Sequence, residues 1–273
     1  MNNISSLYHY TSFETFVKIW LSKKLKFGDI TLLNDICEAD KKISTPLVPG
    51  GIERFSWAEN VVSPYKQLSF TKDFDSKTKG SMSPYMWGHY GDKRKGVCIE
   101  FDFKSFALDE SMIHGSVEYV ERLKIPFDIP ATLNNETEIR KYTRENITQL
   151  FFTKSKDWKP ENEYRIISDK ADWLNFQEKS IKSVCVTNPK GQECEFLENL
   201  LPETIPVMFF GFRSDPDGYY FPTIYKAKDF REVCAINRSM KLEKKNLKEI
   251  IEGQQQELNI SGFKMPVHDI ESL

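Results

Sequence analysis

Residues 154–167 read KSKDWKPENEYRII, and this stretch predicts both a central strand and a site. Its last four residues are strand formers. Because side chains alternate along a strand, we expect Glu161, Glu163 and Arg165 to share one face. Two carboxylates on one face repel, which tends to raise the pKa of one of them, and active sites often contain such pairs. The alternative is an exposed strand face with Glu–Arg pairing across strands.

Length and composition indicate one large folded domain. The chain has 273 residues, of which 40% are hydrophobic and 13% aromatic, enough for a substantial core. We expect a single α+β domain over 1–273, in which 1–170 bear the motifs and 171–273 add strands and a helix that complete or cover the core. The net charge of −2 shows no basic excess of the kind typical of nucleic-acid binding, although a local basic cleft is compatible with it.

The sequence is typical of a soluble protein of the cytoplasm. It contains no apolar run of membrane-spanning length, and its first residues lack the basic and apolar parts of a signal peptide. The five cysteines form no CxxC pair, so we interpret them as reduced, mostly buried thiols. These are Cys37, Cys98, Cys185, Cys194 and Cys234.

Hydrophobic periodicity predicts alternating helices and strands. Strands are expected at 7–11, 65–71, 96–103, 115–120, 161–167, 181–187, 207–212 and, less clearly, 232–236. Helices are expected at 13–24, within 52–62, at 85–91 and over much of 132–155. Residues 241–259 favour a helix, with a strand as the alternative, and 31–38 a loop or helix start. We expect 115–120 to pair with 96–103.

Several residues could carry chemistry. His9 stands on a short strand, where a hydrogen-bonded structural histidine is the alternative to a functional one. Trp87 and Tyr90 lie on one helical face, and either core packing or the wall of a pocket for a flat ring would explain them. Four acidic residues could bind magnesium in a nuclease-like site, although acidic side chains are usually solvated. These are Asp35, Glu38, Glu100 and Asp102.

Familiar catalytic motifs are missing from the sequence. The histidines show no HExxH or HxxxH spacing, so we expect no metal site built on them. There is also no GxSxG, no phosphate-binding loop and no GxGxxG. The sequence therefore gives no motif that would indicate a serine hydrolase, a phosphate-loop enzyme or a dinucleotide-binding fold.

The motifs taken together resemble a known family. LYHYTS, LLNDICE, LSFT, MWGHYGDKRKGVCIEFD and DWKPENEYRI follow one another over about residues 7–168. This order is similar to an uncharacterised bacterial domain-of-unknown-function family that includes AbiG-type abortive-phage-infection proteins and more distantly resembles the ADP-ribosyltransferase fold. Ile36 and Thr71 depart from the family pattern, which usually has proline and serine there.

The resemblance implies a mainly antiparallel split β-sandwich with flanking helices that holds NAD between two sheets. It implies that Glu163 stabilises the positive charge that develops on the ribose, and that Glu161 orients or deprotonates the acceptor. His9 would bind an adenosine ribose hydroxyl, and Trp87 or Tyr90 would stack on nicotinamide. Arg165 would keep Glu163 ionised or contact a phosphate. The other residues implied to bind NAD are Tyr10, Thr11, Ser69, Phe70 and Thr71.

The function implied is that of an NAD-dependent ADP-ribosyltransferase acting as a toxin or anti-phage effector. Its acceptor would be a protein or nucleic acid, and an antitoxin or phage component could be a further partner. The alternative is a catalytically silent relative that senses a nucleotide or binds a partner in phage defence. A metal-dependent nuclease using Asp35 and Glu38 is a third, weaker possibility.

Overall fold

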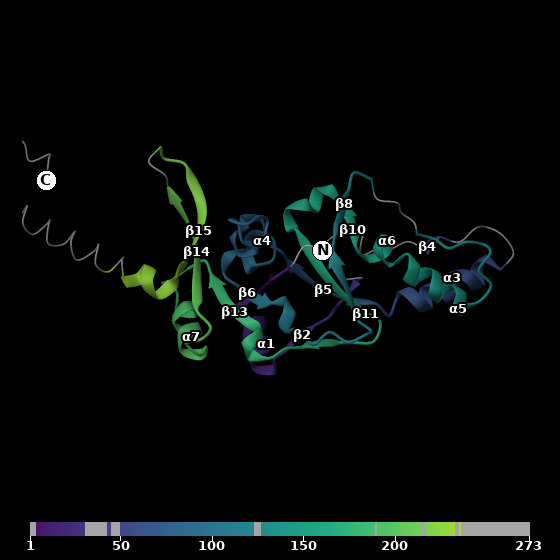
Figure 1. Cartoon of the computed structure of the whole chain (residues 1–273), viewed down its shortest axis with the longest axis horizontal. Helices are drawn as coiled ribbons and strands as arrows, with labels where there is room; N and C mark the ends of the chain where they lie inside the picture. Colours follow the sequence, from purple (N-terminus) through teal and green to yellow (C-terminus); the bar gives the residue numbers. More distant parts are fainter. Residues whose placement is uncertain are drawn as a thin grey trace, which may run out of the picture. The chain divides into compact units, whose positions relative to one another are not determined.

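The computed structural model describes residues 4–30, 43–44, 50–122, 127–188, 190–214, 217–232 and 235. The chain divides into two compact units, Met1–Lys226 and Ala227–Leu273. The first unit contains every strand named below and confirms the predicted α+β class (Figure 1). In the second, residues 227–232 are helical, so the expected strand at 232–236 is wrong at its start.

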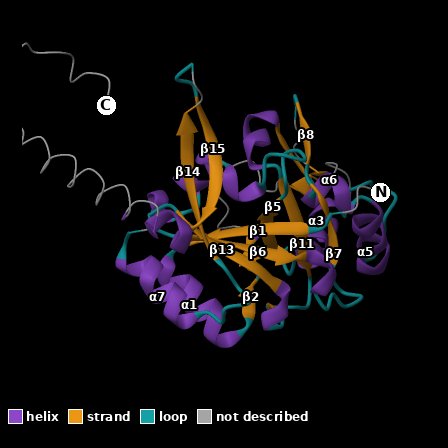
Figure 2. Cartoon of the chain, turned by 60° about the vertical axis from the view of Figure 1, so that its left-hand side comes forward, coloured by secondary structure: helices purple, strands orange, loops and turns teal. Residues whose placement is uncertain are grey.

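One large sheet dominates the first unit (Figure 2). Its strands follow the order β15-β14-β13-β6-β1-β5-β11-β7, and β3 also pairs with β5. Every pairing is antiparallel except that of β13 with β14, so the predicted antiparallel character is confirmed. The bounds are β1 Ser6–Thr11, β3 Gly28–Asp29, β5 Lys66–Thr71, β6 Val97–Asp102, β7 Ile113–Ser116, β11 Glu163–Ser168, β13 Ile181–Val186, β14 Val207–Ser214 and β15 Tyr220–Lys226.

The sheet consists of two well-paired halves joined at one point. β1 pairs with β6 through six residue pairs, and β5 pairs with β11 through six. Between β1 and β5 only Tyr8 and Thr71 pair. We call this junction the seam. Beyond that pair the two strands diverge, and the room between them is where the site described below lies.

Short strands form three smaller pairs. β10 (Thr153–Ser155) runs parallel to β8 (Glu118–Val120), and β4 (Ile43–Ser44) runs parallel to β9 (Phe127–Asp128). β12 (Trp173–Asn175) runs antiparallel to β2 (Lys24–Lys26). The pairing of β10 with β8 places the residues just before β11 beside the large sheet.

The first helix begins where its capping residue predicts. α1 (Phe13–Ser22) is capped by Ser12, whose hydroxyl accepts a hydrogen bond from the Thr15 amide at 3.2 Å. The expected helix within 132–155 is divided into α5 (Glu136–Glu145) and α6 (Ile147–Phe151). The remaining α-helices are α3 (Gly51–Val62), α4 (Pro84–His89) and α7 (Gln192–Leu200). The 3₁₀ turns are η2 (Gly80–Met82), η3 (Asp92–Arg94), η4 (Phe103–Ser105), η5 (Lys156–Glu161) and η6 (Glu178–Ser180).

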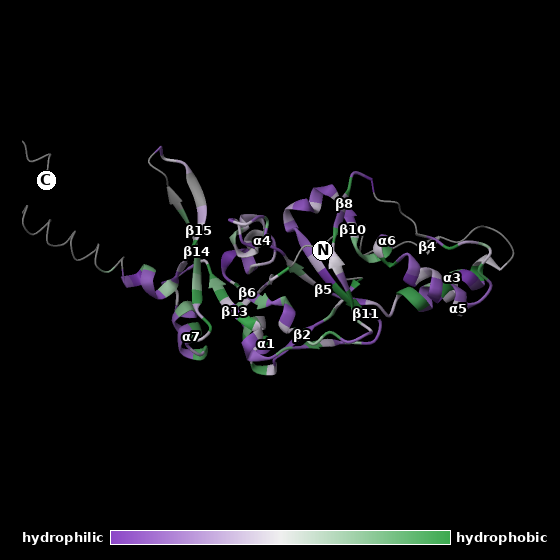
Figure 3. Ribbon diagram, viewed as in Figure 1, coloured by the Kyte–Doolittle hydropathy of each residue, from purple (hydrophilic) through white to green (hydrophobic). Residues whose placement is uncertain are grey.

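Two hydrophobic clusters attach helices to the sheet. α3, α5 and α6 bury their apolar faces against Ile167 of β11, and α3 lies beside α5 (Figure 1). α4 buries Met86 and Trp87 against residues of β1, β6, β13 and β14. The hydrophobic residues concentrate in strands such as β11 and β13, as their green colour in Figure 3 shows.

The expected pairing of 115–120 with 96–103 is wrong. β7 pairs instead with β11, and β8 pairs with β10, because the chain turns at Val117, whose amide donates to the Glu163 carbonyl at 3.0 Å. The neighbours of β6 are β1 and β13. Residues 31–38 and 241–259, where a loop or helix was expected, lie outside the described residues. None of the described helices has the length and apolar character that crossing a membrane requires.

Candidate functional site

A cavity of about 310 Å³ opens at the seam. Its lining includes His9 and Tyr10 from β1, Ser69, Phe70 and Thr71 from β5, Tyr90 after α4, and Glu161 and Glu163. All of these were predicted site residues, and they come from four distant parts of the sequence. The volume lies at the lower end of the range of about 300–1,000 Å³ that small-molecule sites occupy.

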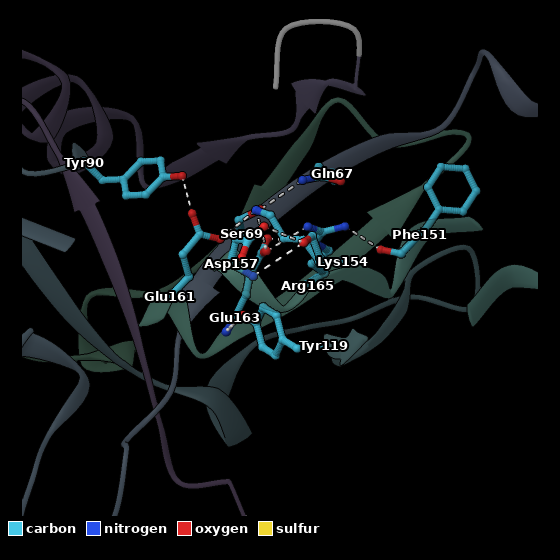
Figure 4. Close-up of polar contacts among 11 residues, drawn as sticks. Gln67, Ser69, Tyr90, Tyr119, Phe151, Lys154, Asp157, Glu161, Glu163 and Arg165 are labelled. Carbon is cyan, nitrogen blue, oxygen red and sulfur yellow. Dashed lines mark hydrogen bonds and ion pairs between the residues drawn. The ribbon is translucent and has the colours of Figure 1, made fainter. Parts of the chain in front are cut away.

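Glu163 opens β11 and is held from behind by Arg165. Arg165 Nε donates to Glu163 Oε1 and Arg165 Nη2 to Glu163 Oε2, both at 2.7 Å. Arg165 Nη1 donates to the Phe151 carbonyl at 2.7 Å (Figure 4). The two residues share a face of β11, as alternation predicts. Arg165 is fully buried and does not line the cavity, so the expectation that it contacts a phosphate there is wrong.

Glu161 does not lie on the strand, which corrects the expectation that all three charged residues share a strand face. It ends η5, and β11 begins only after Asn162 adopts a left-handed conformation with a φ of 45°. Asn162 Nδ2 donates to the carbonyls of Lys72 and Asp73 at 3.2 and 2.9 Å, which ties this turn to the end of β5. Pro160 and Asn162 are turn formers, and they were the sequence signal that the strand starts later.

Lys154 connects the two glutamates, and the sequence did not reveal this role. Its Nζ lies 2.7 Å from Glu161 Oε2 and 3.5 Å from Glu163 Oε2. The hydroxyl of Tyr90 donates to Glu161 Oε1 (Figure 4). Lys154, Glu161 and Glu163 are all buried. Together with Arg165 the cluster holds two positive and two negative charges, so it is neutral when all four are ionised.

The two carboxyl groups have opposite pKa shifts. Burial raises the pKa of Glu161, as does the charge of Glu163, and the ammonium of Lys154 and the hydroxyl of Tyr90 only partly oppose this. Burial also disfavours ionisation of Glu163, but the charges and hydrogen bonds of Arg165 and Lys154 outweigh it and lower its pKa. Glu163 is therefore an anion at neutral pH, and Glu161 is the member of the pair that takes up a proton more readily.

His9 bridges the gap between the diverging strands. Its Nδ1 lies 3.3 Å from the Ser69 carbonyl oxygen, and because a carbonyl only accepts, Nδ1 must carry the proton. Burial lowers the pKa of His9, so the ring is neutral at pH 7. In this tautomer Nε2 is a hydrogen-bond acceptor. His9 thus has a structural contact through one nitrogen and an acceptor at the other.

β5 contributes polar side chains that line the cavity. Gln67 Nε2 donates to Ser69 Oγ at 3.1 Å, and Ser69 in turn hydrogen-bonds Glu163. Gln67 Oε1 and Thr71 Oγ1 are buried and have no hydrogen-bond partner. Buried polar atoms of this kind are uncommon and call for a partner such as a ligand. Gln67 was missed in the sequence because glutamine on a strand carries no distinctive pattern.

Besides Arg165, two predicted ligand-binding residues do not line the cavity. Trp87 is fully buried and donates from Nε1 to the Ser81 carbonyl at 2.9 Å. Its ring meets Tyr10 edge to face and stacks on Phe210. Core packing therefore explains Trp87, and its expected stacking on nicotinamide is wrong. Thr11 ends β1 away from the cavity lining. Tyr90, in contrast, lines the cavity and contacts Glu161, and its stacking on a flat ring stays a prediction.

The acidic residues proposed for magnesium do not assemble in the described part of the chain. Glu100 accepts hydrogen bonds from Ser6 and Ser183 at 2.9 and 2.8 Å, and the Asp102 side chain accepts from the Lys104 amide at the start of η4. Asp35 and Glu38 lie outside the described residues. Within those residues, no group of three or more His, Cys, Asp or Glu side chains could hold a metal ion.

Comparison with known proteins adds one similarity. Residues 86–166 match the sequence profile of a family described as a protein of unknown function (DUF2971). The matched segment starts in α4 and ends in β11, so it includes Tyr90, Lys154, Glu161 and Glu163. It supports the resemblance to an uncharacterised family that the motifs indicated. No curated protein and no solved structure matches the chain.

Proposed function

We propose that the chain is an NAD-dependent ADP-ribosyltransferase with a split β-sandwich core that divides at the seam. One observation carries the proposal most strongly: His9 and Glu163 line the same cavity although they lie far apart in the sequence. The two residues stand on opposite sides of the seam, on β1 and β11. A ligand in the cavity would therefore contact both halves of the sheet.

The polar atoms of the cavity suit the nucleoside part of NAD. His9 Nε2 and the unpartnered Gln67 Oε1 accept hydrogen bonds, and Thr71 Oγ1 can donate or accept. Ribose hydroxyls and the carboxamide of nicotinamide are donors of the kind these acceptors require. The volume of about 310 Å³ suits one nucleoside, so the second half of NAD would extend towards the cavity mouth, where exposed Lys26 could face a phosphate.

The charges of the site suit cleavage of a glycosidic bond. NAD would supply ADP-ribose, and breaking its bond to nicotinamide develops positive charge on the ribose, as in glycoside hydrolysis. A carboxylate that is already ionised and fixed in direction stabilises such charge without reorganisation. Glu163 meets both conditions, because Arg165 binds its two oxygens and lowers its pKa.

Glu161 is assigned the proton transfer. Its raised pKa brings it closer to neutral pH, which favours a general base. In this role it would accept a proton from the acceptor, a protein or nucleic acid. In a bacterial cell the activity would serve a toxin or anti-phage effector.

The test is incubation with labelled NAD and total cell protein and nucleic acid. Wild type should release nicotinamide and transfer label, and Glu163→Gln should lose at least about a hundredfold in rate. Glu145→Gln is the matched control, because this glutamate is exposed on α5 and its side chain is remote from the cavity lining. If wild type neither binds NAD nor releases nicotinamide, the proposal is wrong.

A second candidate is a silent relative that binds a nucleotide or partner in phage defence. The observation that favours it is the pairing of both Glu163 oxygens with Arg165, an arrangement that a purely structural ion pair would also show. Such a protein would bind NAD without releasing nicotinamide, and its overexpression would not slow growth. In that case the growth of cells carrying Glu163→Gln would equal that of wild type.

A further inference from the structure

The cluster contains one cation that the proposed chemistry does not yet use. Lys154 lies in β10, and in the pairing with β8 it stands opposite Tyr119. The Tyr119 hydroxyl accepts a hydrogen bond from the Glu163 amide at 2.8 Å. The β8–β10 pair therefore fixes both a phenol and an ammonium at the first residue of β11. The Lys154 ammonium also lies 4.7 Å from the centre of the Trp158 ring, which limits its freedom.

Lys154 lies where its charge can offset the repulsion between the two glutamates. Their carboxylates line one cavity, and like charges at short range favour protonation of one of them. Arg165 contacts Glu163 and the Phe151 carbonyl. Among the described residues, Lys154 is the cation with ion pairs to both glutamates.

We propose that Lys154 is a positioning residue that bridges the two carboxylates and keeps Glu161 ionised at the cavity wall. Its charge offsets the repulsion between the glutamates, and its shorter contact, 2.7 Å, is to Glu161. Glu161 can then accept a proton at neutral pH. This role rests on the proposed transferase function, because it concerns the base of that reaction.

The surroundings of Glu161 show that Lys154 is its main cationic partner. Tyr85 of α4 and the Tyr90 hydroxyl after α4 lie near Glu161. Glu163 of β11 also lies near Glu161 and is bound by Arg165. Tyr119 faces the pair from β8. The phenols are neutral near pH 7, and Arg165 is bound to Glu163. Removal of the Lys154 charge should therefore leave two carboxylates that must share one proton.

The experiment compares Lys154→Met with Lys154→Arg. Methionine keeps the length of the side chain without its charge, and arginine keeps the charge. Lys156→Met is the control, because Lys156 is exposed and its ion pair among the described residues is with Glu121, not with either glutamate of the cavity. Nicotinamide release is measured between pH 5 and 9, and the glutamate carboxyl groups are titrated by carbon-13 NMR on the same proteins.

We expect Lys154→Met to shift the acidic limb of the rate profile upward by at least about one pH unit. At pH 7 its kcat should fall about 10- to 100-fold, with recovery at higher pH. Lys154→Arg and Lys156→Met should keep the wild-type profile. In the NMR titration, Lys154→Met should show a carboxyl group that titrates at a higher pH than in wild type.

Two results would overturn the proposal: a wild-type rate profile for Lys154→Met, or wild-type carboxyl titrations in that variant. The titration needs no activity, so it tests Lys154 even if wild type releases no nicotinamide and the transferase proposal fails. If Lys154→Met does not fold, the double variant Lys154→Met/Glu161→Gln removes one positive and one negative charge. This variant should fold, because the lost charges cancel, and its failure to fold would overturn a role of Lys154 in balancing the charge of Glu161.

Discussion

Arg165 lies directly behind Glu163 on the same strand and binds both oxygens of its carboxylate at 2.7 Å. The side chain of Arg165 is completely buried, and it also donates to the Phe151 carbonyl at 2.7 Å. A bidentate pair of this kind fixes the direction of the carboxylate as well as its charge. Glu163 therefore presents a fixed anion to the cavity, which is the property that the proposed chemistry needs.

Acid should destabilise the protein through Glu163. Its pKa is lowered to about 2, below the ordinary value of about 4.3, so its contribution to stability is present above pH 4.3 and is lost as pH falls towards 2. The shift corresponds to roughly 3 kcal/mol. Glu161, whose pKa is raised, acts in the opposite sense and loses its contribution as pH rises. Urea unfolding at pH values from 2 to 6 measures the slope.

Glu163→Gln is the variant that tests this acid dependence. It should lower stability at pH 6, because the buried charge of Arg165 loses its partner, and it should flatten the slope between pH 5 and 2. Glu145→Gln, at an exposed position, should keep the wild-type slope. An unchanged slope in Glu163→Gln would contradict the lowered pKa.

The two ring nitrogens of His9 should have different roles, Nδ1 in stability and Nε2 in ligand binding. In His9→Asn the amide can still donate to the Ser69 carbonyl, but the acceptor at Nε2 is lost. We expect a Tm close to that of wild type and an NAD affinity weakened about tenfold, the value of one hydrogen bond. Calorimetry measures both quantities, and His9→Ala should lower both. Unchanged affinity in His9→Asn would mean that Nε2 does not contact the ligand.

Trp87 should affect stability and not ligand binding. Its side chain is fully enclosed between Tyr10 and Phe210. Trp87→Ala should lower the free energy of unfolding by about 3–5 kcal/mol, as for other large core side chains. Trp87→Phe, which keeps an aromatic ring in the core, should bind NAD as wild type does. If a folded Trp87→Phe variant bound NAD more weakly than wild type, Trp87 would contact the ligand after all.

Backbone strain in η3 should be removable. Asp92, Lys93 and Arg94 have φ values of 47°, 50° and 74°, a conformation that costs side-chain-bearing residues about 1–2 kcal/mol each. Lys93→Gly should therefore raise the free energy of unfolding by about 0.5–1 kcal/mol after the extra entropy of glycine is counted. Lys95→Gly removes the same charge where φ is −94°, and it should instead lower stability. Urea unfolding of the two variants gives the comparison, and equal effects would exclude strain relief.

The sequence could predict elements that carry a local signal. The Ser12 cap and apolar spacing indicated α1, and alternation indicated β6 and β11. The sequence of a strand does not indicate which distant strand it pairs with. The expected partner of β6 was the nearest strand in sequence, whereas the structure uses β1 and β13. Register and neighbour choice depend on tertiary packing, which a single sequence does not display.

The site was predictable where residue type and motif order coincided. His9, Ser69, Tyr90 and Glu163 were expected and line one cavity. Lys154 was not expected, because a lysine in a charged run looks like a solvated residue until its partners are known. The role of Trp87 was ambiguous for the opposite reason, since its size suits a core and a pocket equally.

The single pairing of Tyr8 with Thr71 has a consequence for the way the protein comes apart. The two halves of the sheet are each well hydrogen-bonded and are joined by one residue pair, so they should unfold locally as separate cooperative units. The amides of β6 and of β11 should then exchange hydrogen at independent rates. A small molecule that contacts His9 in one unit and Glu163 in the other would couple the two units. Its binding should then lower deuterium uptake even in strands that it does not contact.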